Sequence, residues 1–176
     1  MARKNIVTLF GVCGAGKGDI GKIVSARSNR EFISAGDIQR EHAALRSVTI
    51  EAQAGESADL EHDYRVDREI IPRRCRVGKP VLCDARLGWH FLPESYKICL
   101  WCDDLVRFAR LAKREGVTDV DKVGGLVLGR ERDDRRRFER LYDIVYPPKF
   151  EMFHLIINTT NLTPAEGAKI IMAAID

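Results

Sequence analysis

Residues 6–24 read IVTLFGVCGAGKGDIGKIV, and this stretch decides the fold. Its first five residues are a mainly apolar run that predicts a buried strand. The next seven, Gly11-Val12-Cys13-Gly14-Ala15-Gly16-Lys17, satisfy the pattern GxxxxGK. Ile20, Ile23 and Val24 then share one face of a helix. This order of strand, glycine-rich loop and helix is the context in which the pattern binds phosphate.

The chemistry of the loop follows from its residue types. Glycines let backbone N–H groups wrap an anion, and the N-terminus of the following helix adds the positive end of its dipole. Lys17 adds a point charge. We therefore predict that residues 11–17 bind the phosphates of a purine nucleotide.

The remainder of the chain alternates short apolar runs with longer amphipathic ones, which is typical of a parallel α/β sheet. Five strands are predicted, at Asn5–Phe10, Glu31–Ser34, Pro80–Cys83, Lys97–Trp101 and Leu155–Asn158. No linker or internal repeat divides the chain, so residues 1–176 are expected to form one domain.

Two helices have a clear apolar face. In the first, Asp103 is the expected cap, with Leu105, Phe108, Ala109 and Ala112 inward and Arg107, Arg110 and Arg114 on the opposite side. In the second, Ala168, Ile171, Met172 and Ile175 face inward behind a Thr163–Glu166 capping box.

Other segments fit the alternation poorly. Residues 47–63 are polar and predict a small helical excursion, whereas Pro72 predicts a break or kink in the helix around it. Gly124, Gly125 and Gly129 lie in a stretch that otherwise favours helix, and they suggest a hinge before an arginine-rich helix.

Charge and composition exclude several classes of protein. Among 176 residues, 29 basic and 26 acidic side chains give a net charge of +3, too small to predict a nucleic-acid or membrane partner. No apolar run approaches the ~20 residues of a membrane span, and no signal-peptide pattern opens the chain. A cytoplasmic location is expected by default.

The five cysteines include the pair Cys99 and Cys102, which has CxxC spacing. A zinc site needs two further ligands with suitable spacing, and none is evident. Residues three apart on a strand point to opposite faces. We therefore interpret the cysteines as reduced thiols that act as small apolar side chains.

Acidic residues near the loop affect its interpretation. A Ser or Thr that helps bind Mg²⁺ usually follows the loop lysine, but here Gly18 and Asp19 follow. Asp19 either repels a polyphosphate or complements the helix dipole. Asp84 ends an apolar run, and in a P-loop protein such a carboxylate holds Mg²⁺ through water.

An arginine-rich segment at 130–140 has helical spacing. Arg130, Asp134 and Arg137 stand at i, i+4 and i+7, so a helix places them on one face. Arginine is suited to bidentate phosphate contacts. The alternative is a solvent-exposed face of interleaved ion pairs.

Several segments together resemble the archaeal-type cytidylate kinases within the P-loop nucleoside monophosphate kinases. They are FISAGDIQRE at 32–41, DARLGW at 84–89, the helix 106–116, RERDDRRRF at 130–138, Leu141-Tyr142 and IINTT at 156–160. The resemblance covers nearly the whole chain in order. It departs at Gly18 and Asp19, where that family has Ser-Thr, and at Pro72, beside Ile70 and Ile71.

The resemblance implies a three-layer α/β/α fold with a five-stranded parallel sheet. It also implies a helical monophosphate-binding insertion at about 36–78 and a lid at about 115–140. The implied reaction moves the γ-phosphoryl group of ATP to CMP or dCMP with Mg²⁺.

The resemblance also implies roles for individual residues. On the ATP side they are the loop residues Gly11, Gly14, Ala15, Gly16, Lys17, Gly18 and Asp19, with Asn158 and Thr159 near the adenine and Asp84 at the metal. On the acceptor side they are Ser34, Asp37, Arg40, Arg86, Arg130, Asp134 and Arg137. Arg110 would stabilise the charge of the transition state, and Lys17 and Arg137 are the other predicted catalytic residues.

Two other functions remain open on the sequence. One is a nucleotide-binding protein whose transfer activity Asp19 has removed or altered. The other is a related P-loop kinase with a different small acceptor, suggested by Pro72 and its apolar neighbours. A nucleic-acid partner is the least favoured, because acidic residues interleave with the arginines.

Overall fold

The computed structural model describes residues 4–45 and 65–175. Five parallel strands form one sheet in the order β2-β3-β1-β4-β5. Strand β1 (Ile6–Gly11) is central, between β3 (Val81–Asp84) and β4 (Tyr96–Trp101), with β2 (Glu31–Ser34) and β5 (Leu155–Asn158) at the edges. All five predicted strands are found to within one residue, which confirms the α/β fold class.

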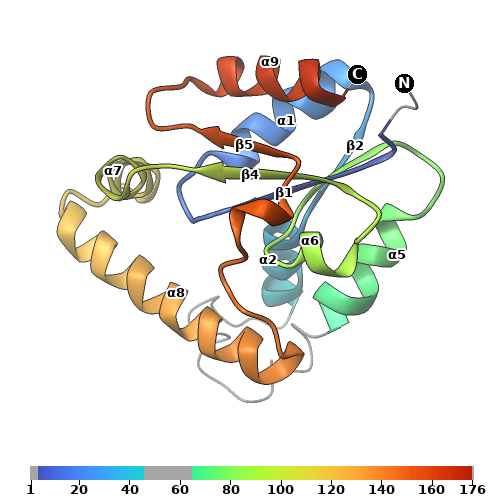
Figure 1. Cartoon of the computed structure of the whole chain (residues 1–176). Coiled ribbons are helices and arrows are strands. Elements are labelled where there is room, and N and C mark those ends of the chain that lie inside the picture. Colours follow the sequence, from blue (N-terminus) through green and yellow to red (C-terminus); the bar gives the residue numbers. More distant parts are fainter. Residues whose placement is uncertain (1–3, 46–64, 176) are drawn as a thin grey trace.

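Helices cover both faces of the sheet (Figure 1). Helices α1 (Lys17–Ser28) and α9 (Pro164–Ile175) pack side by side on one face. The opposite face carries a π-helix (Val66–Ile70), α5 (Ile71–Cys75) and α6 (Gly88–Phe91). The other helices among the described residues are α2 (Ala35–Leu45), α7 (Asp104–Glu115), α8 (Val120–Tyr142) and the 3₁₀ turn Phe150–Met152.

The largest core cluster lies between the sheet and the α1–α9 layer. Val7 and Leu9 of β1 are fully buried there, together with Ile20 and Val24 of α1 and Ile171 of α9. The inward faces predicted for α1 and α9 are therefore confirmed. Thr163 and Glu166 also form the predicted capping box, since Thr163 N donates to Glu166 Oε2 at 2.8 Å and Glu166 N donates to Thr163 Oγ1 at 3.3 Å.

The two cysteines with CxxC spacing are buried in different clusters. Cys102 packs with the α1–α9 layer, whereas Cys99 packs beneath α6 with Phe10 and Trp89. This separation is the one that strand geometry predicts.

The buried face predicted for α7 is partly wrong. Leu105 is 75% exposed, whereas Arg107 is only 2% exposed and lies inward with Phe108, Leu111 and Ala112. Periodicity alone places an arginine outside, but this one is neutralised by two carboxylates, as described below. Asp103 precedes the helix as expected, although its side chain forms no capping hydrogen bond.

The predicted hinge in the glycine-containing stretch is also wrong. Helix α8 runs without interruption through Gly124, Gly125 and Gly129. A Cβ at Gly124 would come within 2.7 Å of the ring of Phe108, so this glycine permits close packing of α7 against α8.

Near Pro72 the helix changes type, from the π-helix to α5, directly before the proline. The break expected there is thus a change in helical winding. The helical excursion expected at 47–63 lies outside the described residues. No helix in the described part of the chain is both long and apolar enough to cross a membrane.

Candidate functional site

The glycine-rich loop joins the carboxyl end of β1 to α1. Gly14 and Gly16 adopt left-handed conformations, with φ of 84° and 85°, and Ala15 N donates to the carbonyl oxygen of Val12 at 3.2 Å. Helix α1 then begins at Lys17, where the first N–H groups of a helix have no partner within it. This geometry makes the loop a binding site for an anion.

Lys17 lies along the loop. Its Nζ donates to the carbonyl oxygens of Gly11 at 2.7 Å and Val12 at 3.1 Å. The ammonium group is thus held beside the position that the loop N–H groups surround. A bound phosphate would compete with these two carbonyls for it.

Two structural elements support the loop. A Cβ at Gly14 would lie 2.7 Å from the backbone oxygen of Arg107, so α7 packs directly against the loop. Directly after β5, the buried hydroxyl of Thr159 donates to the carbonyl oxygen of Ala15 at 3.0 Å. The neighbouring Asn158 is exposed, and its side-chain oxygen accepts a hydrogen bond from Thr160 N at 3.0 Å.

Asp84 stands next to the loop. It ends β3 and pairs in register with Leu9 of β1. Burial raises the pKa of the Asp84 carboxyl, while the positive charges of Lys17 and Arg86 oppose the rise. The structure therefore brings a carboxylate and the loop lysine together, as the sequence predicted.

Gly18 and Asp19 occupy the first turn of α1. A Cβ at Gly18 would meet no other atom within 4 Å, and Asp19 is exposed. The substitution of the usual hydroxyl by glycine is therefore not forced by packing.

The start of α2 lies at the end of strand β2. Ser34 accepts a hydrogen bond from Asp37 N at 3.2 Å, and Asp37 pairs with Arg40 on the helix surface. The charges of Asp37 and Arg40 both act on the Asp84 carboxyl. Ser34, Asp37, Arg40 and Asp84 thus lie together at the carboxyl ends of the neighbouring strands β2 and β3.

A cluster of arginines surrounds the buried carboxylate of Asp134 in α8. Arg86 and Arg137 both donate to it, Arg137 at 2.7 Å. The positive charge of Arg86, with burial, lowers the pKa of Arg130, which shows that Arg130 is close to the same group. The predicted face of Arg130, Asp134 and Arg137 is therefore directed at Arg86.

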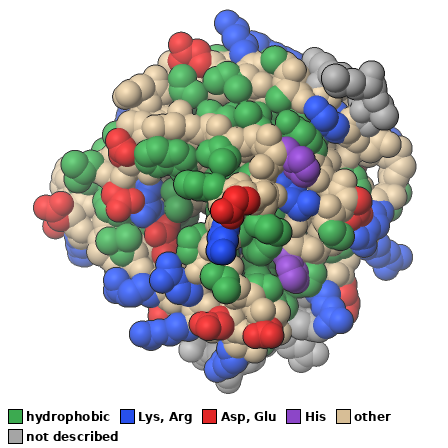
Figure 2. All heavy atoms as spheres, viewed as in Figure 1, with side chains coloured by type: hydrophobic (Ala, Val, Ile, Leu, Met, Phe, Trp, Pro, Cys, Tyr) green, Lys and Arg blue, Asp and Glu red, His purple; other side chains and the backbone are tan. Residues whose placement is uncertain are grey.

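Other arginines of α8 lie on its outward face. Arg132, Arg135 and Arg136 are exposed. Figure 2 shows Lys and Arg side chains gathered over this helix, with acidic side chains among them. The segment thus has one face directed at Arg86 and one exposed face, and phosphate binding by the first face stays a prediction.

Arg110 is placed apart from this cluster. Its guanidinium donates to the carbonyl oxygens of Thr159 at 2.8 Å and Thr160 at 3.2 Å, beside the end of β5. It lies with Asn158 and Thr159, on the side where the adenine was expected.

Two further residues border the site, and sequence reasoning missed both. Arg107 contacts the loop from α7, donating to the carbonyl oxygen of Cys13 at 3.4 Å. Tyr146 is the second residue, and its hydroxyl interacts electrostatically with Arg86 and Asp134. Burial raises the pKa of this hydroxyl. Tyr146 has no motif around it that would have identified it.

The carboxylates present suit a metal that is held mostly by its substrate. In the described parts of the chain, no three His, Cys, Asp or Glu side chains come together as a metal site. Mg²⁺ commonly keeps several waters and binds one or two carboxylates plus phosphate oxygens. Asp84 beside the phosphate loop fits that mode of binding.

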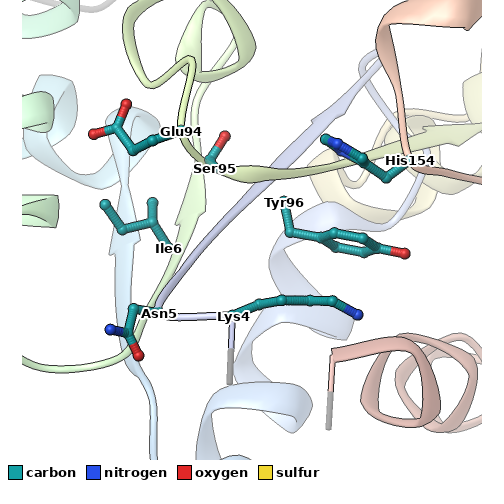
Figure 3. Close-up of a pocket in the computed structure, with 7 residues that line it drawn as sticks. All are labelled: Lys4, Asn5, Ile6, Glu94, Ser95, Tyr96 and His154. Carbon is teal, nitrogen blue, oxygen red and sulfur yellow. The ribbon is translucent and has the colours of Figure 1, made fainter. Parts of the chain in front are cut away.

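A hollow of about 410 Å³ lies at the other end of the strands, where β1 and β4 begin (Figure 3). The ring of Tyr96 lies between His154, stacked at 4.9 Å, and the Lys4 ammonium, 4.1 Å from the ring centre. Lys4 donates to the carbonyl oxygen of Ala174, and His154 Nδ1 accepts from Lys97 N. These groups serve packing, at a distance from the loop.

Comparison with known proteins places the chain among nucleotide-dependent enzymes. Residues 7–141 match the family model described as AAA domain. The chain is 32% identical to a cytidylate kinase of Sulfurisphaera tokodaii over 171 residues, which cover 96% of this chain and 93% of that protein. It is 30% identical to a cytidylate kinase of Archaeoglobus fulgidus, with 97% and 94% covered.

Solved structures agree on the fold. The shikimate kinase of Acinetobacter baumannii superposes with a TM-score of 0.61 at 19% identity, over 99% of this chain and 93% of that one. At this identity the likeness bears on the fold alone, which is that of a P-loop kinase.

Proposed function

Since this chain belongs to the cytidylate kinase family of P-loop kinases, we propose that it transfers the γ-phosphoryl group of ATP to CMP or dCMP. One observation carries the proposal. The loop at 11–17 and the arginines around Asp134 are two separate anion-binding groups, and Asp84 lies within the electrostatic field of both. Phosphoryl transfer requires two phosphates to be held in line.

In this proposal the loop and Lys17 bind the donor phosphates. Arg40, Arg86 and Arg137 bind the acceptor phosphate, while Arg130 and Asp134 contact the phosphate and the sugar. Ser34 and Asp37 line the acceptor pocket. The monophosphate-binding region extends over about 36–78 and the lid over about 115–140, which includes most of α8.

Arg110 is assigned with Asn158 and Thr159 to the end of the site that holds the adenine. Its hydrogen bonds to the carbonyl oxygens of Thr159 and Thr160 support this placement. A direct role in neutralising the transition state would require its guanidinium to leave these carbonyls.

Mg²⁺ bound to ATP would neutralise charge that develops on the phosphate oxygens. Asp84 would hold it through water, and Lys17 would keep the adjacent phosphoryl group oriented. The arginines would neutralise and align the acceptor phosphate. Most of the catalysis is then positioning. A cytoplasmic location remains part of this proposal.

The test is a panel of nucleoside monophosphates with ATP and Mg²⁺, read by ADP formation. We expect turnover with CMP and dCMP, and its loss in Lys17→Ala. No turnover with any monophosphate, in a protein that still binds ATP, would instead support the nucleotide-binding alternative that Asp19 suggests.

Turnover with a different small acceptor is the remaining alternative. It was suggested by the apolar residues beside Pro72. In the structure Ile71 packs in the core with Val81 and Cys83, so the apolar character of this segment has a structural cause. The apolar residues beside Pro72 therefore give no reason to expect a different acceptor.

A further inference from the structure

Arg107 occupies a junction between three parts of the molecule. Its side chain is 3% exposed, although it belongs to a helix surface. Its backbone and Cβ pack against Gly14 of the phosphate loop, and its Nη1 donates to the carbonyl oxygen of Cys13 at 3.4 Å. On its other side it reaches α8.

The contact with α8 is a two-pronged ion pair. Arg107 Nη1 donates to Glu131 Oε1 at 2.8 Å, and Nη2 donates to Glu131 Oε2 at 3.1 Å. Parallel hydrogen bonds of this kind fix orientation as well as distance. A third bond, from Nε to Asp104 Oδ1 at 2.7 Å, stays within α7 and reaches a carboxylate that is 61% exposed.

Glu131 lies one helical turn before Asp134. The two carboxylates hold different arginines: Glu131 holds Arg107 beside the phosphate loop, and Asp134 holds Arg86 after β3. Within one turn, α8 is therefore fastened both to the donor loop and to the acceptor arginines. A rigid turn of helix spans the two halves of the site.

We propose that Arg107 is a positioning residue, which acts through Glu131 to hold the phosphate loop and the arginines of α8 at the separation needed for transfer. The inference rests on the proposed kinase function and adds a residue to it. Arg107 already has three acceptors, so it acts through the loop and α8 and not by binding phosphate itself.

The test compares Glu131→Gln, which removes the charge but keeps the shape, with Asp104→Asn as the matched control. Both variants remove one carboxylate partner of Arg107, but only the first frees α8. We expect Glu131→Gln to lower kcat about 100-fold, as displacement by about 1 Å does, with each KM within threefold. Asp104→Asn should stay within twofold of the parent protein.

A second readout needs no turnover. Amide hydrogen exchange at Ala15, whose N–H donates to the carbonyl oxygen of Val12 at 3.2 Å, should quicken at least tenfold in Glu131→Gln and remain unchanged in Asp104→Asn. This readout separates the two proposals: absence of kinase activity in the parent protein would refute the function, whereas unchanged exchange would refute the coupling of Arg107 to the loop.

Arg107→Lys keeps the positive charge but loses the paired hydrogen bonds to Glu131. It provides a second test of the contact if Glu131→Gln does not fold. It should also lower kcat while keeping each KM. A kcat within twofold of the parent in both folded variants would overturn the proposal. So would a loss explained entirely by a smaller folded fraction.

Discussion

Asp84 is subject to opposing demands. Burial raises the pKa of its carboxyl. The ionised form, which a metal would need, therefore lowers the stability of the protein when no metal is bound. A carboxyl whose pKa is raised by folding adds stability below its ordinary pKa of 3.8, and this contribution is lost as the pH rises through the raised value. The loss is complete once the pH exceeds the raised value.

We therefore expect Asp84→Asn to raise the free energy of unfolding at pH 7 and to lower kcat by about 100-fold. The measurements are urea unfolding without nucleotide and steady-state kinetics with Mg²⁺–ATP. The gain in stability should shrink as the pH falls through the raised pKa of Asp84 and should be absent below 3.8. A gain that persists at that pH would show that the carboxyl is not the cause.

Gly18 leads to a second prediction about a single residue. Space is open at its Cβ position, so a serine side chain fits without displacing a neighbour. A hydroxyl directly after the loop lysine helps hold Mg²⁺ in many P-loop proteins. We expect Gly18→Ser, alone or with Asp19→Thr, to raise turnover about tenfold when Mg²⁺ is limiting, an order-of-magnitude expectation from one added polar contact.

The measurement is ADP formation against free Mg²⁺ concentration. Gly125→Ser is the control, because it adds the same side chain to an open, exposed position on α8. An unchanged dependence on Mg²⁺ would mean that the missing hydroxyl does not limit metal binding here.

At the scale of the helices, substitutions at two glycines of α8 distinguish a role in packing from a role as a hinge. An alanine at Gly124 would press on the ring of Phe108, whereas an alanine at Gly125 would meet nothing. We expect Gly124→Ala to destabilise by about 1–3 kcal/mol through overpacking. Gly125→Ala should stabilise by about 1 kcal/mol through helix propensity.

Urea unfolding of both variants checks this prediction, with equal m values as a sign of unchanged compactness. A hinge would behave differently, because either alanine would stiffen it and lower kcat to the same degree. Equal effects of the two substitutions on stability would contradict the packing explanation.

The same pair of helices shows where sequence reasoning ends. The spacing of Arg130, Asp134 and Arg137 predicts a shared face, because only the helical repeat is needed. The burial of Arg107 depends on Glu131, 24 residues away on another helix, and apolar periodicity carries no information about that partner. Long-range neutralisation of charge therefore turned α7 from its predicted face.

For the whole molecule, the five strands were predictable because each is a short apolar run, and their parallel direction because helices connect them. The loop was predictable because its strand and helix flank it directly. The relation between the loop and the arginine cluster was not, since it depends on two ion pairs between separate segments, Arg107 with Glu131 and Arg86 with Asp134. Only the resemblance over the whole chain indicated that Arg86 and Asp134 belong to one site, and it gave no role to Arg107.

That convergence gives a prediction about the molecule's charge balance. Asp134 is 6% exposed and neutralises Arg86 and Arg137, with Arg130 nearby. Asp134→Asn would leave three arginines facing one another, and we expect the free energy of unfolding to fall by about 3 kcal/mol. The measurement is urea unfolding at constant ionic strength.

Inorganic phosphate should restore part of this stability, because the arginines then gain the anion that they are arranged to bind. A ligand at 100 times its Kd stabilises by about 2.7 kcal/mol, so the unfolding midpoint should rise with phosphate concentration. Asp133→Asn is the matched control, since it changes the net charge equally but lies on the exposed face of α8. If phosphate stabilised both variants alike, its effect would reflect net charge. That result would contradict the proposal that the cluster around Asp134 binds the acceptor phosphate.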